Sequence, residues 1–230
     1  MENPPSEKAP LPQKDSEVPI LEVALVITAT FLLTIVLGAV VLLTLGTATA
    51  LIFGELIILL VPLGYLLTKR VNIKSYIGIH PHPRSVAVGL AFGVILLLLN
   101  IVVSEALTII FGVSQAIEES NALLANLSTS TVGFIAVASS LLLAGFCEEF
   151  AFRGFLQNAL SRKYSFVPAL VLSAIVFGLF HFDPQIVYIL AAMTSGLVLG
   201  YINQRWNYVA AATAHSTMNL IVLLILVMNL

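Results

Sequence analysis

The chain has 230 residues, of which 59% are hydrophobic and only 10% are charged, and its formal net charge is −2 at pH 7. An average soluble domain carries about 25% charged residues, so this composition excludes a soluble globular protein and indicates helices that span a membrane. The small net charge argues against nucleic acid as a partner, and the single cysteine, Cys147, excludes an internal disulfide and a cysteine-rich metal site.

The first nineteen residues differ in composition from the rest of the chain. Residues 1–19 contain five prolines and charges of both signs. They lack the basic start, short apolar run and cleavage site of a signal peptide. We therefore expect a disordered, proline-rich tail, and insertion directed by the first apolar span.

Long apolar runs follow, each of about the length that crosses the hydrocarbon core as a helix. They predict an all-α fold, a polytopic transmembrane helical bundle of about seven spans, with a range of six to eight. Three spans fall within residues 20–112 and four within residues 131–230. Their expected limits are 20–46, 48–68, 86–111, 132–160, 166–182, 185–203 and 207–228, with a polar loop around Glu118 and Glu119.

Positive charges between the spans predict the orientation. The loop after the second span carries Lys69, Arg70, Lys74 and Arg84, and Arg162, Lys163 and Arg205 follow the fourth and sixth spans. Basic loops favour the cytoplasmic side. A multi-pass integral membrane protein surrounded by membrane lipids is therefore expected, with a cytoplasmic N-terminus. The short chain favours a prokaryotic plasma membrane, and the sequence does not predict an oligomeric state.

Two adjacent carboxylates lie inside the fourth span. Ionisable residues within a span are expensive and suggest function. Glu149 and Arg153 are four residues apart, the favourable spacing for an intrahelical ion pair. Glu148 points about 100° away and has no such partner, which suits a general base. The structural alternative is one ion pair plus one side chain that reaches the interface.

Two histidines lie in later spans. His181 ends the fifth span after Phe177, and Asp183, expected at the interface, precedes a proline that ends the helix. A lone histidine in an apolar helix is usually a hydrogen-bonded core residue. His215 and Asn219 share one face of the last span and offer N–H donors, as an oxyanion hole needs, although interhelical hydrogen bonding is the alternative.

Other sequence features narrow the chemistry. No GxSxG, HExxH or Walker motif occurs, so serine hydrolase, zincin and P-loop interpretations lose their usual support. The isolated acids Glu55 and Glu105 are expected near the outer interface or as local hydrogen-bonding partners. The pairs Gly89/Gly93 and Gly196/Gly200 indicate close helix packing.

Three motifs together resemble a known family. Glu148-Glu149-xxx-Arg153, Phe177-xxx-His181 and His215-xxx-Asn219 resemble the EExxxR, FxxxH and HxxxN motifs of the CPBP intramembrane proteases, in the expected order. That family includes the Rce1-type CAAX prenyl proteases and the bacterial Abi (bacteriocin-immunity) proteins. The resemblance covers about residues 133–220 and marks residues 131–230 as a CPBP-type catalytic membrane domain.

The resemblance implies an endopeptidase acting on a peptide or lipidated protein substrate, prenylated CAAX-type proteins or bacteriocin-like peptides included. It implies that Glu148 and His181 activate a water and that His215 and Asn219 stabilise the oxyanion. Glu149, Arg153 and Phe177 would support the site.

The resemblance leaves the cofactor open. Glu148, His181 and His215 could ligate Zn²⁺ and leave a fourth position free. A carboxylate–histidine pair can also polarise water without a metal, and a metal-free or metal-optional reaction is the expectation.

Two other classes of function stay open. The first is a non-catalytic membrane scaffold or bacteriocin-immunity protein with the same fold. The second is a transporter that uses the acids and histidines as a relay, but the broken helices or paired repeats that transporters usually have are not evident. A geometric question also remains, because His181 reaches the depth of Glu148 and His215 only if the fifth span tilts or begins outside the hydrocarbon.

Overall fold

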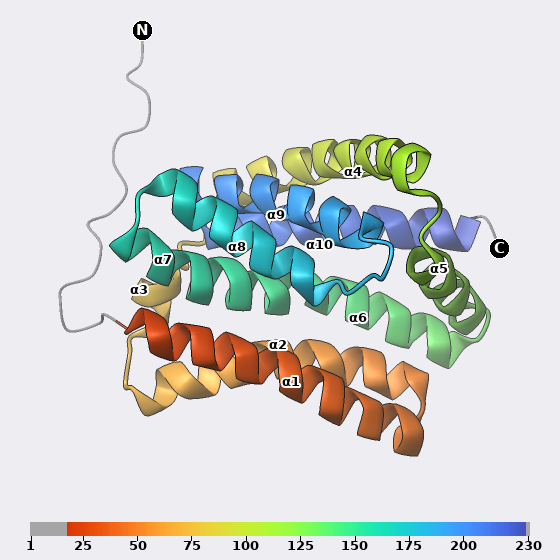
Figure 1. The fold of residues 1–230 in the computed structure, drawn as a ribbon, viewed down its shortest axis with the longest axis horizontal. Helices are drawn as coiled ribbons and strands as arrows, with labels where there is room; N and C mark the ends of the chain where they lie inside the picture. The colour runs from red at the N-terminus through yellow and green to blue at the C-terminus, as the bar shows by residue number, and fades with distance from the viewer. Residues whose placement is uncertain (1–17, 229–230) are drawn as a thin grey trace, which may run out of the picture.

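The computed structural model describes residues 18–228, so nearly all of the predicted tail lies outside the described residues. Within 18–228 the chain is all-α, and no strand occurs (Figure 1). The first half contains α1 (Ile20–Leu45), α2 (Thr47–Thr68), α3 (Ile73–Ile77), α4 (Pro83–Phe111) and α5 (Gln115–Ser128). The second half contains α6 (Thr131–Glu149), the π-helix η2 (Phe150–Gln157), α7 (Asn158–Lys163), α8 (Phe166–Phe180), α9 (Val187–Arg205) and α10 (Tyr208–Met228).

Six helical segments within the described residues are long and apolar enough to cross a membrane. They are α1, α2, α4, the continuous helical run Thr131–Lys163, α9 and α10. The expected fifth span, α8, is apolar but has only 15 residues. At 1.5 Å per residue it is about 22 Å long, shorter than a core of about 30 Å. The protein is therefore a multi-pass membrane protein in which α8 ends inside the bundle, and this brings His181 to the interior.

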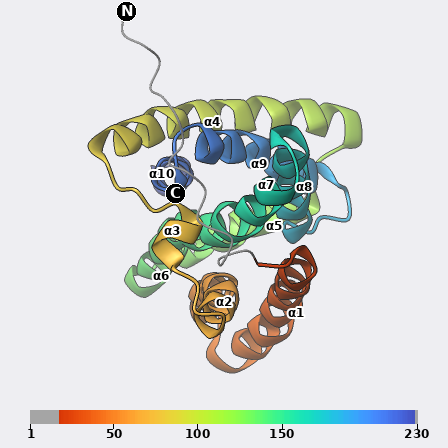
Figure 2. The ribbon, with the colours of Figure 1, turned by 90° about the vertical axis from the view of Figure 1, so that its left-hand side faces the viewer.

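The helices pack as a layered bundle. Figures 1 and 2 show the hairpin α1–α2 on one side of α6, with α10 and α4 on the other and the pair α8–α9 beside them. Glycines allow the closest contact between α4 and α10: a Cβ atom at Gly89 would lie 2.5 Å from Thr213 Cβ, and one at Gly93 would lie 2.5 Å from Thr217 Cβ. The expected close packing at this GxxxG pair is present.

The interior is centred on η2. All eight of its residues are buried, and its aromatic side chains pack against α1, α2 and α3. Asn158, directly after η2, donates hydrogen bonds of 3.1 Å to the carbonyl oxygens of Tyr76 and Ile77. These bonds anchor the short helix α3 to the end of the fourth span. Large apolar side chains cover the outside instead, as expected of a surface that faces lipid.

The local structure differs from expectation in two places. The predicted polar loop is mostly helix α5, because the Ser114 side chain accepts a hydrogen bond from the Ile117 N–H and caps the helix N-terminus. The fourth span is helical to Lys163, yet its second half contains the π-helix Phe150–Gln157 and is not continuous α-helix. Such π segments often occur at functional sites, and this one begins directly after Glu149.

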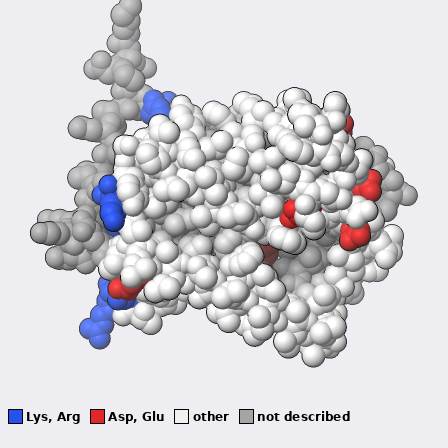
Figure 3. Space-filling view, in the orientation of Figure 1, with Lys and Arg blue, Asp and Glu red and all other residues white. Residues whose placement is uncertain are grey.

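Charged side chains are separated along the molecule. In the space-filling view the basic side chains lie at the left end, where α1 begins and α2 ends, and acidic ones gather at the opposite end (Figure 3). An acidic side chain also lies among the basic ones, since Lys69 Nζ is 2.6 Å from Glu22 Oε2. The sequence predicts that the basic loops lie on one side of the membrane. In the structure the basic side chains accordingly lie at one end of the bundle.

Candidate active site

Glu149 and Arg153 form a fully buried ion pair in the fourth span. Both side chains are 0% exposed, and Arg153 Nη1 lies 2.9 Å from Glu149 Oε1. Arg153 Nη2 donates to the carbonyl oxygen of Gly196 on α9 at 3.3 Å. Its guanidinium also lies 4.2 Å from the ring centroid of Phe177 on α8. The predicted ion pair is thus present, and it joins three helices at one point.

His215 reaches this pair from α10. Its Nδ1 atom is 3.0 Å from Glu149 Oε1, and its Nε2 atom is 3.9 Å from Glu148 Oε2. The contact requires α6 and α10 to lie very close. A Cβ atom at Gly145 would meet Ser216 Oγ at 2.1 Å and the Ser216 backbone nitrogen at 2.6 Å. The absence of a side chain at Gly145 therefore lets His215 reach both carboxylates.

His181 lies just beyond the end of α8. Its Nδ1 atom is 2.9 Å from the carbonyl oxygen of Phe177, and a carbonyl can only accept a hydrogen bond. Nδ1 therefore carries the proton, and Nε2 of the neutral ring is an acceptor. The ring packs edge-on against Tyr188, with centroids 5.1 Å apart. This tautomer presents a basic nitrogen, which is what water activation requires.

Asp183 holds the turn that carries His181. Its Oδ1 accepts from the Gln185 N–H at 3.0 Å, and its Oδ2 accepts from the Tyr188 N–H at 2.8 Å. Ile186 between them has φ 63°, in the left-handed region. Asp183, expected at the interface, is buried within the protein, and its side chain satisfies backbone donors at the start of α9.

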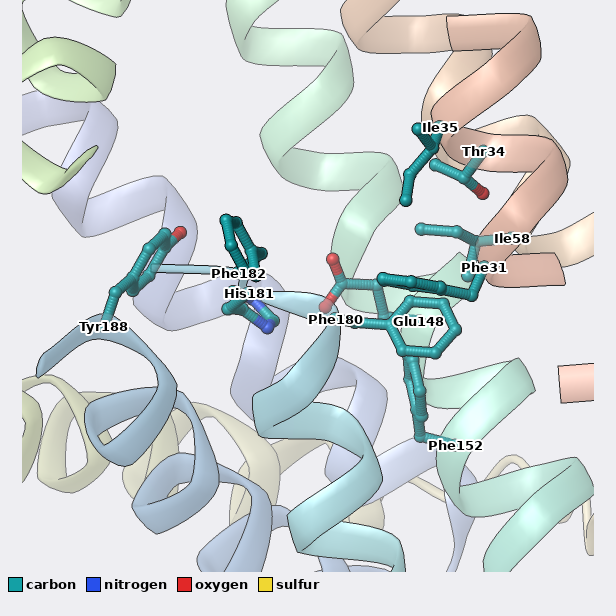
Figure 4. A pocket seen from close by; sticks show the side chains of 10 residues that line it. All are labelled: Phe31, Thr34, Ile35, Ile58, Glu148, Phe152, Phe180, His181, Phe182 and Tyr188. Carbon is teal, nitrogen blue, oxygen red and sulfur yellow. The ribbon is translucent and has the colours of Figure 1, made fainter. Parts of the chain in front are cut away.

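A cavity of about 390 Å³ joins Glu148 and His181. Figure 4 shows both side chains among those that surround it, and Figure 3 shows a hollow above α1 with acidic atoms in its depth. The other lining side chains are Phe31, Thr34, Ile35, Ile58, Phe152, Phe180, Phe182 and Tyr188. The arrangement places a carboxylate and an imidazole from different helices around one space inside the apolar body.

The two residues expected as oxyanion donors lie beside this cavity and do not line it. His215 is 5% exposed and sits behind Glu148. Asn219, one helical turn farther along α10, donates from Nδ2 to the carbonyl oxygen of Leu141 at 2.9 Å. An amide NH₂ has two donors, so one remains after this bond to α6.

A third acid near the cavity was not expected there. Glu55 on α2 interacts electrostatically with Glu148 and Cys147 on α6. Its Oε2 atom is buried and has no hydrogen-bond partner. Glu55 thus faces the bundle interior near Glu148. The signal in the sequence was an isolated acid within an apolar span, which by itself did not reveal which face of the helix it occupies.

The described residues do not form a ready-made metal site. Within 18–228, no group of three His, Cys, Asp or Glu side chains is arranged to hold a metal ion. The donor set Glu148, His181 and His215 therefore lacks the convergence that tetrahedral zinc needs. The expected metal-free or metal-optional reaction stays a prediction, with zinc held by these three side chains as its alternative.

The family comparison agrees with this geometry. Residues 129–221 match the family model described as type II CAAX prenyl endopeptidase Rce1-like. This segment is an Rce1-like domain of the CPBP family. The family of this domain is one of hydrolases. Comparisons with curated proteins and with solved structures found no match.

The Rce1-like domain contains all three motifs but not the whole cavity. Its boundaries run from just before α6 into α10. The cavity side chains Phe31, Thr34, Ile35 and Ile58 come from α1 and α2, outside the Rce1-like domain. Helices that the family model does not cover therefore complete the space next to Glu148.

Proposed function

We propose that the protein is an intramembrane endopeptidase that hydrolyses peptide bonds of membrane-associated substrates with a water activated by Glu148 and His181. One observation carries the proposal: these two side chains, from α6 and from the end of α8, line a single cavity within the membrane body. The Rce1-like domain that contains both residues supports it.

The reaction begins with a water held between the two side chains. Glu148 accepts a proton from the water while Nε2 of His181 accepts a hydrogen bond from its second O–H. The water oxygen attacks the carbonyl carbon and forms a tetrahedral intermediate. Glu148 then gives its proton to the amide nitrogen, the C–N bond breaks, and a carboxylic acid and an amine leave. The apolar walls strengthen each of these electrostatic interactions.

His215 and Asn219 lie beside the cavity, behind Glu148, and in this proposal their N–H groups reach the oxyanion once the substrate is bound. Because the Nδ1 proton of His215 is directed at Glu149 Oε1, only the imidazolium form has an Nε2–H left to donate. The ion pair of Glu149 with Arg153 holds this ring in place, and Phe177 supports Arg153. Asn219 contributes the N–H that Leu141 does not use. Donors fixed before the reaction stabilise the developing charge most effectively.

The substrate is a membrane peptide or lipidated protein, with prenylated CAAX-type proteins among the candidates. A lipid attached to the substrate would stay among the acyl chains while the peptide enters the cavity. The basic end of the bundle (Figure 3) supports a cytoplasmic N-terminus, and we place the protein in a prokaryotic plasma membrane.

The proposal is tested by replacing Glu148 with Gln in protein reconstituted into liposomes. Cleavage of lipidated and unlipidated reporter peptides should fall about 100-fold or more, the usual contribution of a general base. Glu105→Gln, an exposed acid on α4, is the control and should keep wild-type activity. Full activity of Glu148→Gln would refute the base assignment. An inactive wild type would favour the non-catalytic scaffold or immunity protein.

A further inference from the structure

The cavity at Glu148 has two walls of different origin. One wall belongs to the Rce1-like domain and carries Glu148 and His181. The opposite wall belongs to the hairpin α1–α2 and carries Phe31, Ile35 and Ile58. A peptide that fills this cavity beside Glu148 therefore also contacts side chains of α1 and α2.

The hairpin wall presents apolar surface to the cavity. Phe31, Ile35 and Ile58 have no polar side-chain atoms. The hydroxyl of Thr34, the one polar side chain of this wall, already donates to the carbonyl oxygen of Thr30 at 2.9 Å. A charged side chain placed here would lose its hydration without gaining a partner on this wall, which is unfavourable. The wall is suited to an aliphatic or aromatic side chain.

The same wall lies beside an opening to the lipid. The rings of Phe31 on α1 and Phe180 on α8 are in edge contact, with centroids 5.0 Å apart. One turn farther along α1, Ile35 is 54% exposed, and across the cavity Phe182 is 72% exposed. Figure 3 shows the hollow on this face. A segment lying in the bilayer can thus reach the cavity from the side without crossing the bundle.

We propose that Phe31, Ile35 and Ile58 form a specificity pocket that takes the apolar side chain next to the scissile bond of a membrane-embedded peptide. Ile35, at the open rim, limits the size of this side chain. The inference rests on the proposed function, since it assigns the pocket to a substrate of that reaction. It makes α1 and α2, which lie outside the Rce1-like domain, the part of the chain that selects the substrate.

The test compares the wild-type protein, Ile35→Trp and Ile35→Ala in nanodiscs. Peptides of one sequence carry Ala, Leu, Trp or Lys beside the scissile bond, and kcat/KM is measured for each. Ile35→Trp narrows the pocket and should lower the Trp/Ala ratio of kcat/KM about tenfold, whereas Ile35→Ala should raise that ratio, as expected for small size changes in an apolar pocket. The Lys peptide should be the poorest substrate of every protein. Val36→Trp is the matched control, because Val36 is exposed on the same helix and does not line the cavity.

A second measurement separates this inference from the proposed function. The Kd of each peptide for each protein should follow the same size order as kcat/KM. The pocket inference is overturned, and the proposed protease function kept, by either of two results. One is cleavage whose size preference is the same in the Ile35 variants as in the wild type, and the other is cleavage of the Lys peptide as fast as the Leu peptide. Size-dependent binding without any cleavage keeps the pocket and overturns the protease. Neither cleavage nor size-dependent binding overturns both.

Discussion

His215 and Glu149 are 66 residues apart in the chain, and the Nδ1 atom of His215 lies 3.0 Å from the Oε1 atom of Glu149. The same oxygen accepts from Arg153 at 2.9 Å. One buried carboxylate oxygen therefore fixes both a guanidinium and an imidazole. Glu148, the neighbouring residue, is left with a side chain that faces the cavity.

Glu149 should matter more for stability than Glu148. Replacing Glu149 with Ala leaves Arg153 buried without its charge partner, and breaking a buried pair in this way costs about 3–5 kcal/mol. Glu148→Ala removes a side chain whose Oε2 has no hydrogen-bond partner, so a smaller loss is expected. Thermal unfolding of both variants in detergent measures the difference. Equal losses, or a larger loss for Glu148→Ala, would contradict the role given to Glu149.

Gly145 should be intolerant of any side chain. In Gly145→Ala the new Cβ would overlap Ser216, which forces α6 and α10 apart and costs about 1–3 kcal/mol. His215 lies on α10 and moves with it. The rate of peptide cleavage should therefore fall by more than the lowered unfolding temperature, and so the loss of folded protein, accounts for. Gly64→Ala is the control, since no atom lies within 4 Å of a Cβ there. Wild-type cleavage by Gly145→Ala would show that the close helix contact is not needed.

Asp183 should act by positioning His181. Asp183→Ala removes the acceptor for two backbone N–H groups, and loss of such a helix cap costs about 0.5–2 kcal/mol. The turn after His181 should loosen, so kcat should fall with little change in KM. Asp183→Asn keeps one acceptor and should restore part of the activity. Kinetics on the reporter peptides measure this order. An Asp183→Ala protein that loses stability but keeps kcat would leave Asp183 a purely structural cap.

Chelators should leave the activity in place. The described residues bring no three suitable donors together for a metal, whereas Glu148 and His181 can activate water directly. Cleavage is measured after dialysis against a strong zinc chelator and again after zinc is added back. A loss on chelation that zinc reverses would establish the alternative ligand set of Glu148, His181 and His215.

The orientation can be read from single cysteines. Lys74 on α3 and Glu119 on α5 are exposed, and the distribution of basic loops predicts that Lys74 lies inside and Glu119 outside the cell. In intact cells a membrane-impermeant thiol reagent should label Glu119→Cys and not Lys74→Cys. The native Cys147 is buried, so the wild-type protein is the unlabelled control. The reverse pattern would invert the assigned topology.

The sequence predicts the features of this protein that depend on neighbours along one helix. Runs of apolar residues predict the spans, because hydrocarbon accepts only satisfied helical backbone. The spacing of Glu149 and Arg153 predicts their ion pair, because residues four apart share a helix face. The same periodicity places His215 and Asn219 on one face of α10.

The tertiary structure alone decides which faces of different helices meet. Lipid-facing and interior side chains are both apolar in a membrane protein, so composition does not distinguish them. The burial of Asp183, the inward position of Glu55 and the wall formed by Phe31 and Ile35 therefore could not be predicted. Each depends on how far one helix rotates and how closely another approaches, which is set by packing between segments distant in the chain.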